Sequence, residues 1–135
     1  MTLDELAATL PNGFHDAYLK ALAIDYVARE ARLLLDIWIG SPRAANEDQR
    51  EAYREGEVVL TGIVFFVCEP PDARYLHQSE VGLRIDTGAI TACANPPSTT
   101  LPNVPDGDFV NWIYVTELNA FMYVAARDAQ LIWRA

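Results

Sequence analysis

The apolar residues of the chain recur mainly with a period of two, which is the period of a strand that buries one face. This alternation begins after Tyr18, is interrupted at residues 28–30 and then resumes. The alternating apolar residues are Leu22, Ile24 and Tyr26 in the first arm and Leu33, Leu35, Ile37 and Ile39 in the second. The pattern predicts a long β-hairpin over residues 18–39. Because Leu34 and Trp38 add apolar side chains on the opposite face, the second arm is expected to be central in its sheet.

Further β-prone stretches follow the hairpin. Residues 58–68 are apolar on both faces and predict a second central strand, which ends at Pro70-Pro71 because proline cannot donate to a ladder. From Val81 the alternation returns, and Thr87-Gly88 predicts a hairpin turn into a return strand at 89–93. The strands predicted near the end of the chain are 110–118, 121–126 and 131–133.

Helix and loop signals are fewer. Thr2-Leu3-Asp4-Glu5 has the form of a capping box and predicts one short helix, which ends at Pro11-Asn12-Gly13. Residues 41–56 are polar and predict a connection, either a loop or a single helix capped by Asn46 and ended by Gly56. Residues 95–108 are rich in proline and predict a long loop.

These elements predict a mainly β (α+β) fold. We expect an antiparallel β-sandwich or a strongly curved sheet of about seven or eight strands, with one short N-terminal helix. A length of 135 residues suits one core, and a hydrophobic fraction of 51% indicates an ordered chain. Residues 1–135 are therefore expected to form a single domain.

The net charge of the chain indicates which partners it can bind, and its cysteine content indicates the cellular compartment. Asp and Glu number 19 against 10 Lys and Arg, so the formal net charge is -9. A field of that sign repels nucleic acid and anionic membranes but suits a basic protein partner. Cys68 and Cys93 lie in apolar runs and are expected to be buried free thiols. With no disulfide scaffold, signal-peptide pattern or membrane-spanning run in the sequence, a cytoplasmic protein of the acidic bacterial kind is expected.

One short motif could carry catalysis. Ile85-Asp86-Thr87-Gly88-Ala89 resembles the catalytic segment of aspartic proteases, in which a hydrophobic residue precedes Asp-Thr-Gly and a small residue follows. The resemblance implies that Asp86 is the catalytic acid or base, Thr87 braces the turn and Gly88 permits close backbone approach, with a dimer supplying the second aspartate. That family also has a later apolar-apolar-Gly segment, whereas the last glycine here, Gly107, lies in the proline-rich stretch. The alternative is a structural turn in which Gly88 adopts a positive φ.

A histidine beside an aspartate forms the second motif. His15 and Asp16 directly precede the first predicted strand, and such a pair could bind a metal or act as a base. The other histidine is His77, and the sequence has no HExxH, CxxC or Cys/His cluster, so no metal ligand set is predicted. The alternative is that the pair ties a turn to backbone amides while Phe14 fills the core. Together with Asp25, His15 and Asp16 are the candidate binding residues.

The same region carries a family resemblance. Phe14-His15-Asp16-Ala17, a strand ending in Ile24-Asp25-Tyr26, a short turn and a second apolar strand resemble the opening of small bacterial immunity proteins and related uncharacterised β families. The resemblance covers residues 13–39. Members of known function bind and neutralise a toxin, so it implies a binding protein without chemistry of its own. An acidic chain suits a basic toxin such as a nuclease.

The sequence thus predicts a non-enzymatic protein-binding domain, immunity-like or antitoxin-like, that needs no cofactor. Its contacts with a basic partner are expected from residues 41–56 and the proline-rich loop. A small hydrolase is one alternative, using Asp86 in a homodimer or a metal at His15. A structural or oligomerising subunit is the other, and it would expose an apolar patch where Trp112 or Trp133 emerges.

Overall fold

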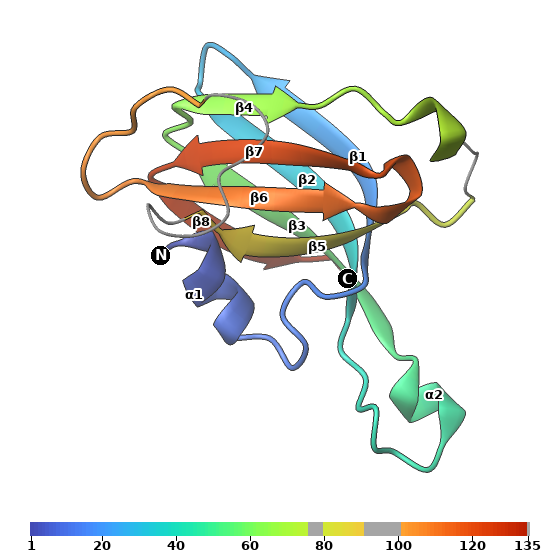
Figure 1. Ribbon diagram of the computed structural model, residues 1–135. Helices are drawn as coiled ribbons and strands as arrows, with labels where there is room; N and C mark the ends of the chain where they lie inside the picture. The colour runs from blue at the N-terminus through green and yellow to red at the C-terminus, as the bar shows by residue number, and fades with distance from the viewer. Residues whose placement is uncertain (76–79, 91–100, 135) are drawn as a thin grey trace.

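The structure, a computed structural model, describes residues 1–75, 80–90 and 101–134 (Figure 1). Its helical elements are α1 (Leu3–Ala8), α2 (Glu47–Arg50) and the short 3-10 helices η1 (Ala73–Tyr75) and η2 (Thr116–Leu118). Its strands are β1 (Ala17–Asp25), β2 (Glu30–Trp38), β3 (Tyr53–Thr61), β4 (Phe65–Cys68), β5 (Leu83–Ala89), β6 (Phe109–Val115), β7 (Ala120–Ala126) and β8 (Asp128–Trp133). The mainly β prediction is confirmed.

Within the described residues, the eight strands form one antiparallel sheet in the order β4-β7-β6-β5-β1-β2-β3-β8. Figure 1 shows the sheet folded over on itself, with β4, β7, β6 and β5 in front of β1, β2, β3 and β8. The chain passes between the two layers where β3 leads to β4 and where β7 leads to β8. These two connections contact each other: the Arg127 N–H, between β7 and β8, donates to the Thr61 carbonyl at the end of β3 at 3.0 Å. The next residue, Gly62, adopts a φ of +65°. The expected curved sheet is therefore what forms, without closing into a barrel.

The core lies between the two layers of the sheet. Inward side chains from both layers fill it, and each fully buried aliphatic side chain contributes about 2 kcal/mol. The most buried are Leu35, Ile37, Val58, Leu60, Ile85, Ile113 and Val124. Helix α1 adds Leu3 and Leu6 to this core. The predicted capping box is present at the start of this helix. The Thr2 hydroxyl accepts from the Glu5 N–H at 3.0 Å, while the Glu5 carboxylate accepts from the Thr2 N–H at 2.8 Å.

The predicted hairpin is confirmed, because β1 and β2 pair from Tyr18↔Asp36 to Asp25↔Glu30, and β2 is central between β1 and β3.

In the predicted connection over residues 41–56, α2 is capped by Asn46, whose side chain accepts from the Asp48 N–H at 2.8 Å. The prediction that Gly56 ends this helix is wrong. Gly56 lies inside β3, where a Cβ would meet the Leu131 side chain at 2.8 Å.

The predicted turn at Thr87-Gly88 is also wrong. Strand β5 runs straight through both residues, with Asp86 opposite Tyr114 and Gly88 opposite Trp112 on β6. Gly88 has no positive φ; it is small because a Cβ there would lie 2.3 Å from the Trp112 ring. The expected return strand at 89–93 falls mostly on residues 91–93, outside the described part of the chain.

The stretch 58–68 does not form one central strand. It divides at Gly62 into β3, which is inside the sheet, and β4, which is an edge strand. For this reason Cys68, expected to be buried, is a free thiol exposed at the end of β4, while Cys93 lies outside the described residues.

Of the predicted proline-rich loop, residues 101–108 are described and contain no helix or strand. No helix in the described residues is long and apolar enough to cross a membrane.

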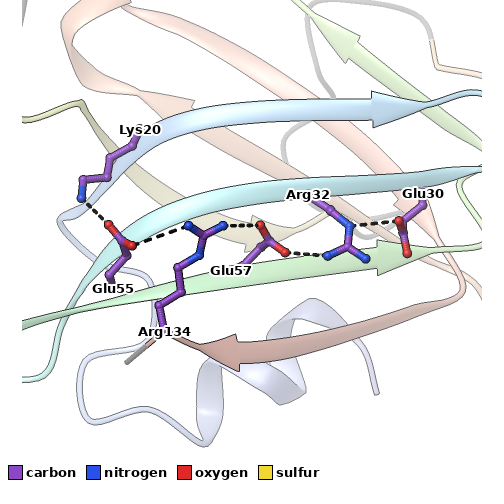
Figure 2. A network of polar contacts seen from close by, with 6 residues as sticks. All are labelled: Lys20, Glu30, Arg32, Glu55, Glu57 and Arg134. Atoms are coloured by element: carbon purple, nitrogen blue, oxygen red, sulfur yellow. Dashed lines mark hydrogen bonds and ion pairs between the residues drawn. The ribbon is translucent and has the colours of Figure 1, made fainter.

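Ion pairs cover the outer surface of β1, β2, β3 and β8 (Figure 2). We call this set the outer charged network; it comprises Lys20, Glu30, Arg32, Asp36, Glu55, Glu57 and Arg134. Glu57 lies at its centre and accepts from Arg32 Nη1 at 2.6 Å and from Arg134 Nη2 at 3.1 Å. Lys20 Nζ donates to Glu55 at 2.6 Å. The network joins four segments of the chain across the sheet.

Candidate functional site

The two motifs singled out in the sequence meet in space. His15 Nδ1 lies 3.0 Å from Asp86 Oδ2, although the two residues are 71 positions apart in the chain. The pairing of β1 with β5 produces this contact, because Ala17 is opposite Ile85 and the segment before β1 therefore runs beside Asp86. The candidate protease aspartate and the candidate metal-binding histidine thus belong to one cluster.

His15 lies between two carboxylates. Its Nε2 is 3.4 Å from Asp16 Oδ2, so each ring nitrogen faces an aspartate oxygen. The pKa of His15 is raised above its ordinary 6.5, mainly by the hydrogen bond to Asp86; burial opposes this increase, and the charges of Asp16 and Asp86 add to it. The side chain is 58% exposed, so solvent screens these interactions. The arrangement favours the protonated imidazolium, since both nitrogens then donate.

The segment that carries His15 is tied to its neighbours. Asn12 Nδ2 donates to the carbonyls of Trp38 at 3.1 Å and Gly40 at 2.8 Å, which fixes the loop to the end of β2. Asp16 adopts a φ of +56°, a left-handed conformation that aspartate tolerates better than most residues. The Tyr53 hydroxyl donates to the Asp16 carbonyl at 3.4 Å. His15 is therefore presented by a loop held at several points.

Asp86 extends from β5 with both carboxylate oxygens engaged. Oδ2 faces His15, and Oδ1 accepts from the Thr87 N–H at 3.0 Å. The partner of this aspartate within the chain is thus a histidine, whereas the protease resemblance implies a second aspartate. The protease hypothesis, which needs Asp86 of another copy, stays a prediction.

A surface hollow of about 450 Å³ lies next to the His15–Asp86 pair. Three parts of the chain line it: α1, the loop before β1, and β5. The lining residues are Asp4, Ala7, Ala8, Asn12, Gly13, Phe14, His15, Asp86, Thr87 and Gly88. We call this feature the hollow. Asp4 and Asp86 place carboxylates on it, and among its described lining residues His15 is the one basic group.

Asp4 is held in place by a buried amide. Asn111, on the inner side of β6 and 1% exposed, donates from Nδ2 to Asp4 Oδ1 at 2.8 Å. This bond spans 107 residues and anchors α1 over the core. It satisfies the amide nitrogen of Asn111, which would otherwise be buried without a partner at a cost of about 1–3 kcal/mol.

Asp25, the third predicted binding residue, does not join this cluster. It lies at the other end of β1, where its Oδ1 accepts from the N–H groups of Val27 at 3.0 Å and Ala28 at 2.9 Å. This geometry is an Asx-type turn that shapes the β1–β2 hairpin. The structure therefore gives Asp25 a local role and brings together only His15, Asp16, Asp86, Thr87 and Gly88.

The cluster is suited to holding a positive charge. No group of three or more His, Cys, Asp or Glu side chains in the described ranges 1–75, 80–90 and 101–134 is arranged to hold a metal ion. His77, the other histidine, is outside those ranges. Both ring nitrogens of His15 face carboxylates, which favour its protonated form.

Sequence reasoning missed three residues of the site: Asp4, Asn12 and Asn111. Asn111 carried a readable signal, since it interrupts the inward alternation of Phe109, Ile113 and Val115 on β6 with a polar side chain. Asp4 and Asn12 carried no such signal. Acidic residues are common in the first turn of any helix, and asparagine is common where a helix ends.

Comparison with known proteins adds no family to this description. No family model matches the chain, and no curated protein matches it. The immunity-protein resemblance over residues 13–39 stays a prediction. Its residues are now placed: Phe14 is buried in the core, His15 and Asp16 lie beside the hollow, and Asp25 shapes the hairpin.

Proposed function

We propose that the protein is a non-enzymatic binding domain whose hollow takes a positively charged side chain of a basic protein partner. The observation that carries this proposal is the placement of the Asp4 and Asp86 carboxylates on one hollow, with His15 as the basic group among its described lining residues. A lysine or arginine head group would make charge-assisted hydrogen bonds with these carboxylates.

The size and lining of the hollow support this occupant. A volume of about 450 Å³ falls in the range of small ligand sites, which span roughly 300–1,000 Å³. Ala7 and Ala8 offer apolar contact for the methylene stem of a lysine or arginine, while the carboxylates offer partners for its charged end. The same ligand chemistry fits both basic side chains.

Long-range charge supports a basic partner as well. A net charge of -9 attracts a cationic protein and speeds its encounter with this chain. A toxin neutralised by an immunity-like protein would be one such partner, and that biological role rests on the resemblance over residues 13–39.

The two alternative functions gain less from the geometry. A histidine-based hydrolase would need a nucleophile in contact with its general base, and both nitrogens of His15 face carboxylates instead. An oligomerising subunit was expected to expose Trp112 or Trp133, but both side chains are half-buried. Trp112 packs over Gly88 and contacts Phe121 edge-on at a ring distance of 6.0 Å.

The test is a titration of the full chain with tetraarginine amide, followed by the amide chemical shifts of each residue in NMR spectra. We expect the largest shifts at residues 12–15 and 86–88, which line the hollow, and none of similar size with tetraglycine amide. The substitution Asp86→Asn should weaken binding about fivefold, since it removes one charge of an exposed pair but keeps an acceptor for the Thr87 N–H.

Asp25→Asn provides the matched control, because it removes the same charge at the far end of β1 and preserves the Asx-type turn. It should leave affinity nearly unchanged. Equal weakening by both substitutions, or shifts spread evenly over the surface, would mean that the peptide responds only to net charge, and the proposal would be wrong.

A further inference from the structure

One carboxylate serves two neighbours at the hollow. Asp86 lines the hollow and at the same time lies 3.0 Å from His15 Nδ1. A cationic ligand and a protonated His15 would therefore compete for the same negative charge. This competition is local, since His15 is itself a lining residue of the hollow.

The charged groups around His15 are mostly acidic. Asp16 faces it from its own segment and Asp86 from β5, and Asp4 of α1 lines the same hollow. From β2 the neutral Trp38 ring lies 6.4 Å away, and from β3 Tyr53 reaches the backbone of Asp16. Arg84, two residues before Asp86 on β5, has its guanidinium 5.9 Å from the Tyr18 ring.

We infer that His15 is a built-in counter-ion of the hollow: protonated, it pairs with Asp86, offsets one negative charge and weakens ligand binding, and neutral, it leaves Asp86 to the cationic ligand. The inference rests on the binding function proposed above and adds its regulation. Binding should therefore strengthen as the pH rises through the pKa of His15.

The proton balance follows from this competition. When a cationic ligand binds, it shifts the imidazolium of His15 toward release of its proton to the solvent, and no covalent bond other than that N–H bond breaks. By reciprocity, the ligand lowers the pKa of His15 by as much as deprotonation of His15 improves ligand binding. The raised pKa of the free protein places the transition somewhat above pH 6.5.

The experiment measures the dissociation constant of tetraarginine amide from about pH 5.5 to about pH 8.5, a range in which arginine stays charged and exposed carboxylates stay ionised. We expect binding about fivefold tighter at the upper end, the size of one exposed charge pair. His15→Gln should remove this dependence, so that its affinity is the same at both ends of the pH range. His77→Gln, the matched control at the other histidine, should keep the full dependence.

An NMR titration of the His15 ring supplies a readout that a merely structural role would not move. Saturation with tetraarginine amide should lower its pKa. If the wild-type protein binds at the hollow with the same affinity at every pH, or if His15→Gln keeps the pH dependence, the counter-ion role is overturned while the binding function stands. If no localised binding occurs at any pH, the proposed function itself is wrong.

Discussion

Two clusters of ionised side chains among the described residues, the outer charged network and the residues around the hollow, differ in how their charges are paired. In the outer charged network, three basic side chains face four carboxylates, and every carboxylate has a basic partner. Asp4 and Asp86 line the hollow, and Asp16 lies beside His15; these three carboxylates have one histidine near them, and Asp4 is held by an amide. Every carboxylate of the network is paired with a basic side chain, whereas carboxylates outnumber basic groups three to one around the hollow. This difference is the reason that we propose binding at the hollow and a structural role for the network.

The two clusters also respond to opposite changes of pH. The pKa of Glu57 is lowered, mainly because Arg32 donates to its carboxylate, so the network contributes stability that is lost as the pH falls through that lowered value. The pKa of His15 is raised, so its pairing contributes stability that is present below pH 6.5 and is lost as the pH rises through the raised value. Of the two clusters, the hollow is the one that contains a histidine, so it is the one whose charge we expect to change near neutral pH.

The largest expected effect comes from two glycines, one in each region. Gly56 lies between Glu55 and Glu57 of the network and opposite Trp133, and Gly88 lies two residues after Asp86 and opposite Trp112. Gly88→Ala would place a Cβ 2.3 Å from the Trp112 ring, so the indole must move. We expect a loss of about 2 kcal/mol in the free energy of unfolding, measured by thermal or urea denaturation, together with weaker peptide binding.

Gly56→Ala is the matched comparison. Its Cβ would meet the terminal methyl group of Leu131 at 2.8 Å, which a rotation of that side chain can relieve, and the Trp133 ring at 3.1 Å, which has to move by only a few tenths of an ångström. The loss should be smaller, about 1 kcal/mol, and peptide binding should not change. If Gly56→Ala weakens binding as much as Gly88→Ala does, the two regions are not independent and the comparison fails.

The sequence was sufficient for those parts of the fold that depend on local burial. Strands β1 and β2 each bury one face against the core, so their alternation was visible, and the α1 cap was explicit in Thr2 and Glu5. Thr87-Gly88 was misread because the same dipeptide occurs in turns and in strands. What makes it a strand is the Trp112 ring, which lies on another strand and cannot be found from local pattern.

The site was found in pieces and not as a whole. His15-Asp16 and Asp86 were each identified by residue type, but their contact depends on the register of Ala17 with Ile85. That pairing is long-range, and periodicity within either strand says nothing about which strand becomes its neighbour. The binding role of Asp25 was inferred from its place in a resemblance, and the structure instead shows the turn that its side chain makes.

A medium effect is expected when the network is opened at its centre. Glu57→Gln removes the charge that faces both Arg32 and Arg134. Because these pairs are exposed, the melting temperature should fall by only a few degrees at neutral pH, and high salt should shrink the difference. The difference should also shrink in acid, as the pH falls from the ordinary glutamate pKa of about 4.3 through the lowered pKa of the wild-type carboxylate. A difference that is unchanged both in acid and in high salt would indicate lost packing instead of lost charge.

The smallest expected effect distinguishes the hollow most directly from the network, because it has the opposite sign with pH. His15→Gln should lower the free energy of unfolding by less than about 1 kcal/mol at pH 6, since the pair is largely exposed. At about pH 8.5 the wild-type imidazole is neutral and the difference should disappear. Denaturant unfolding of both proteins at the two pH values measures it. An equal loss at both would mean that His15 acts by packing near Trp38, whereas a loss confined to acid would show that the hollow carries a charge which the protein itself can neutralise.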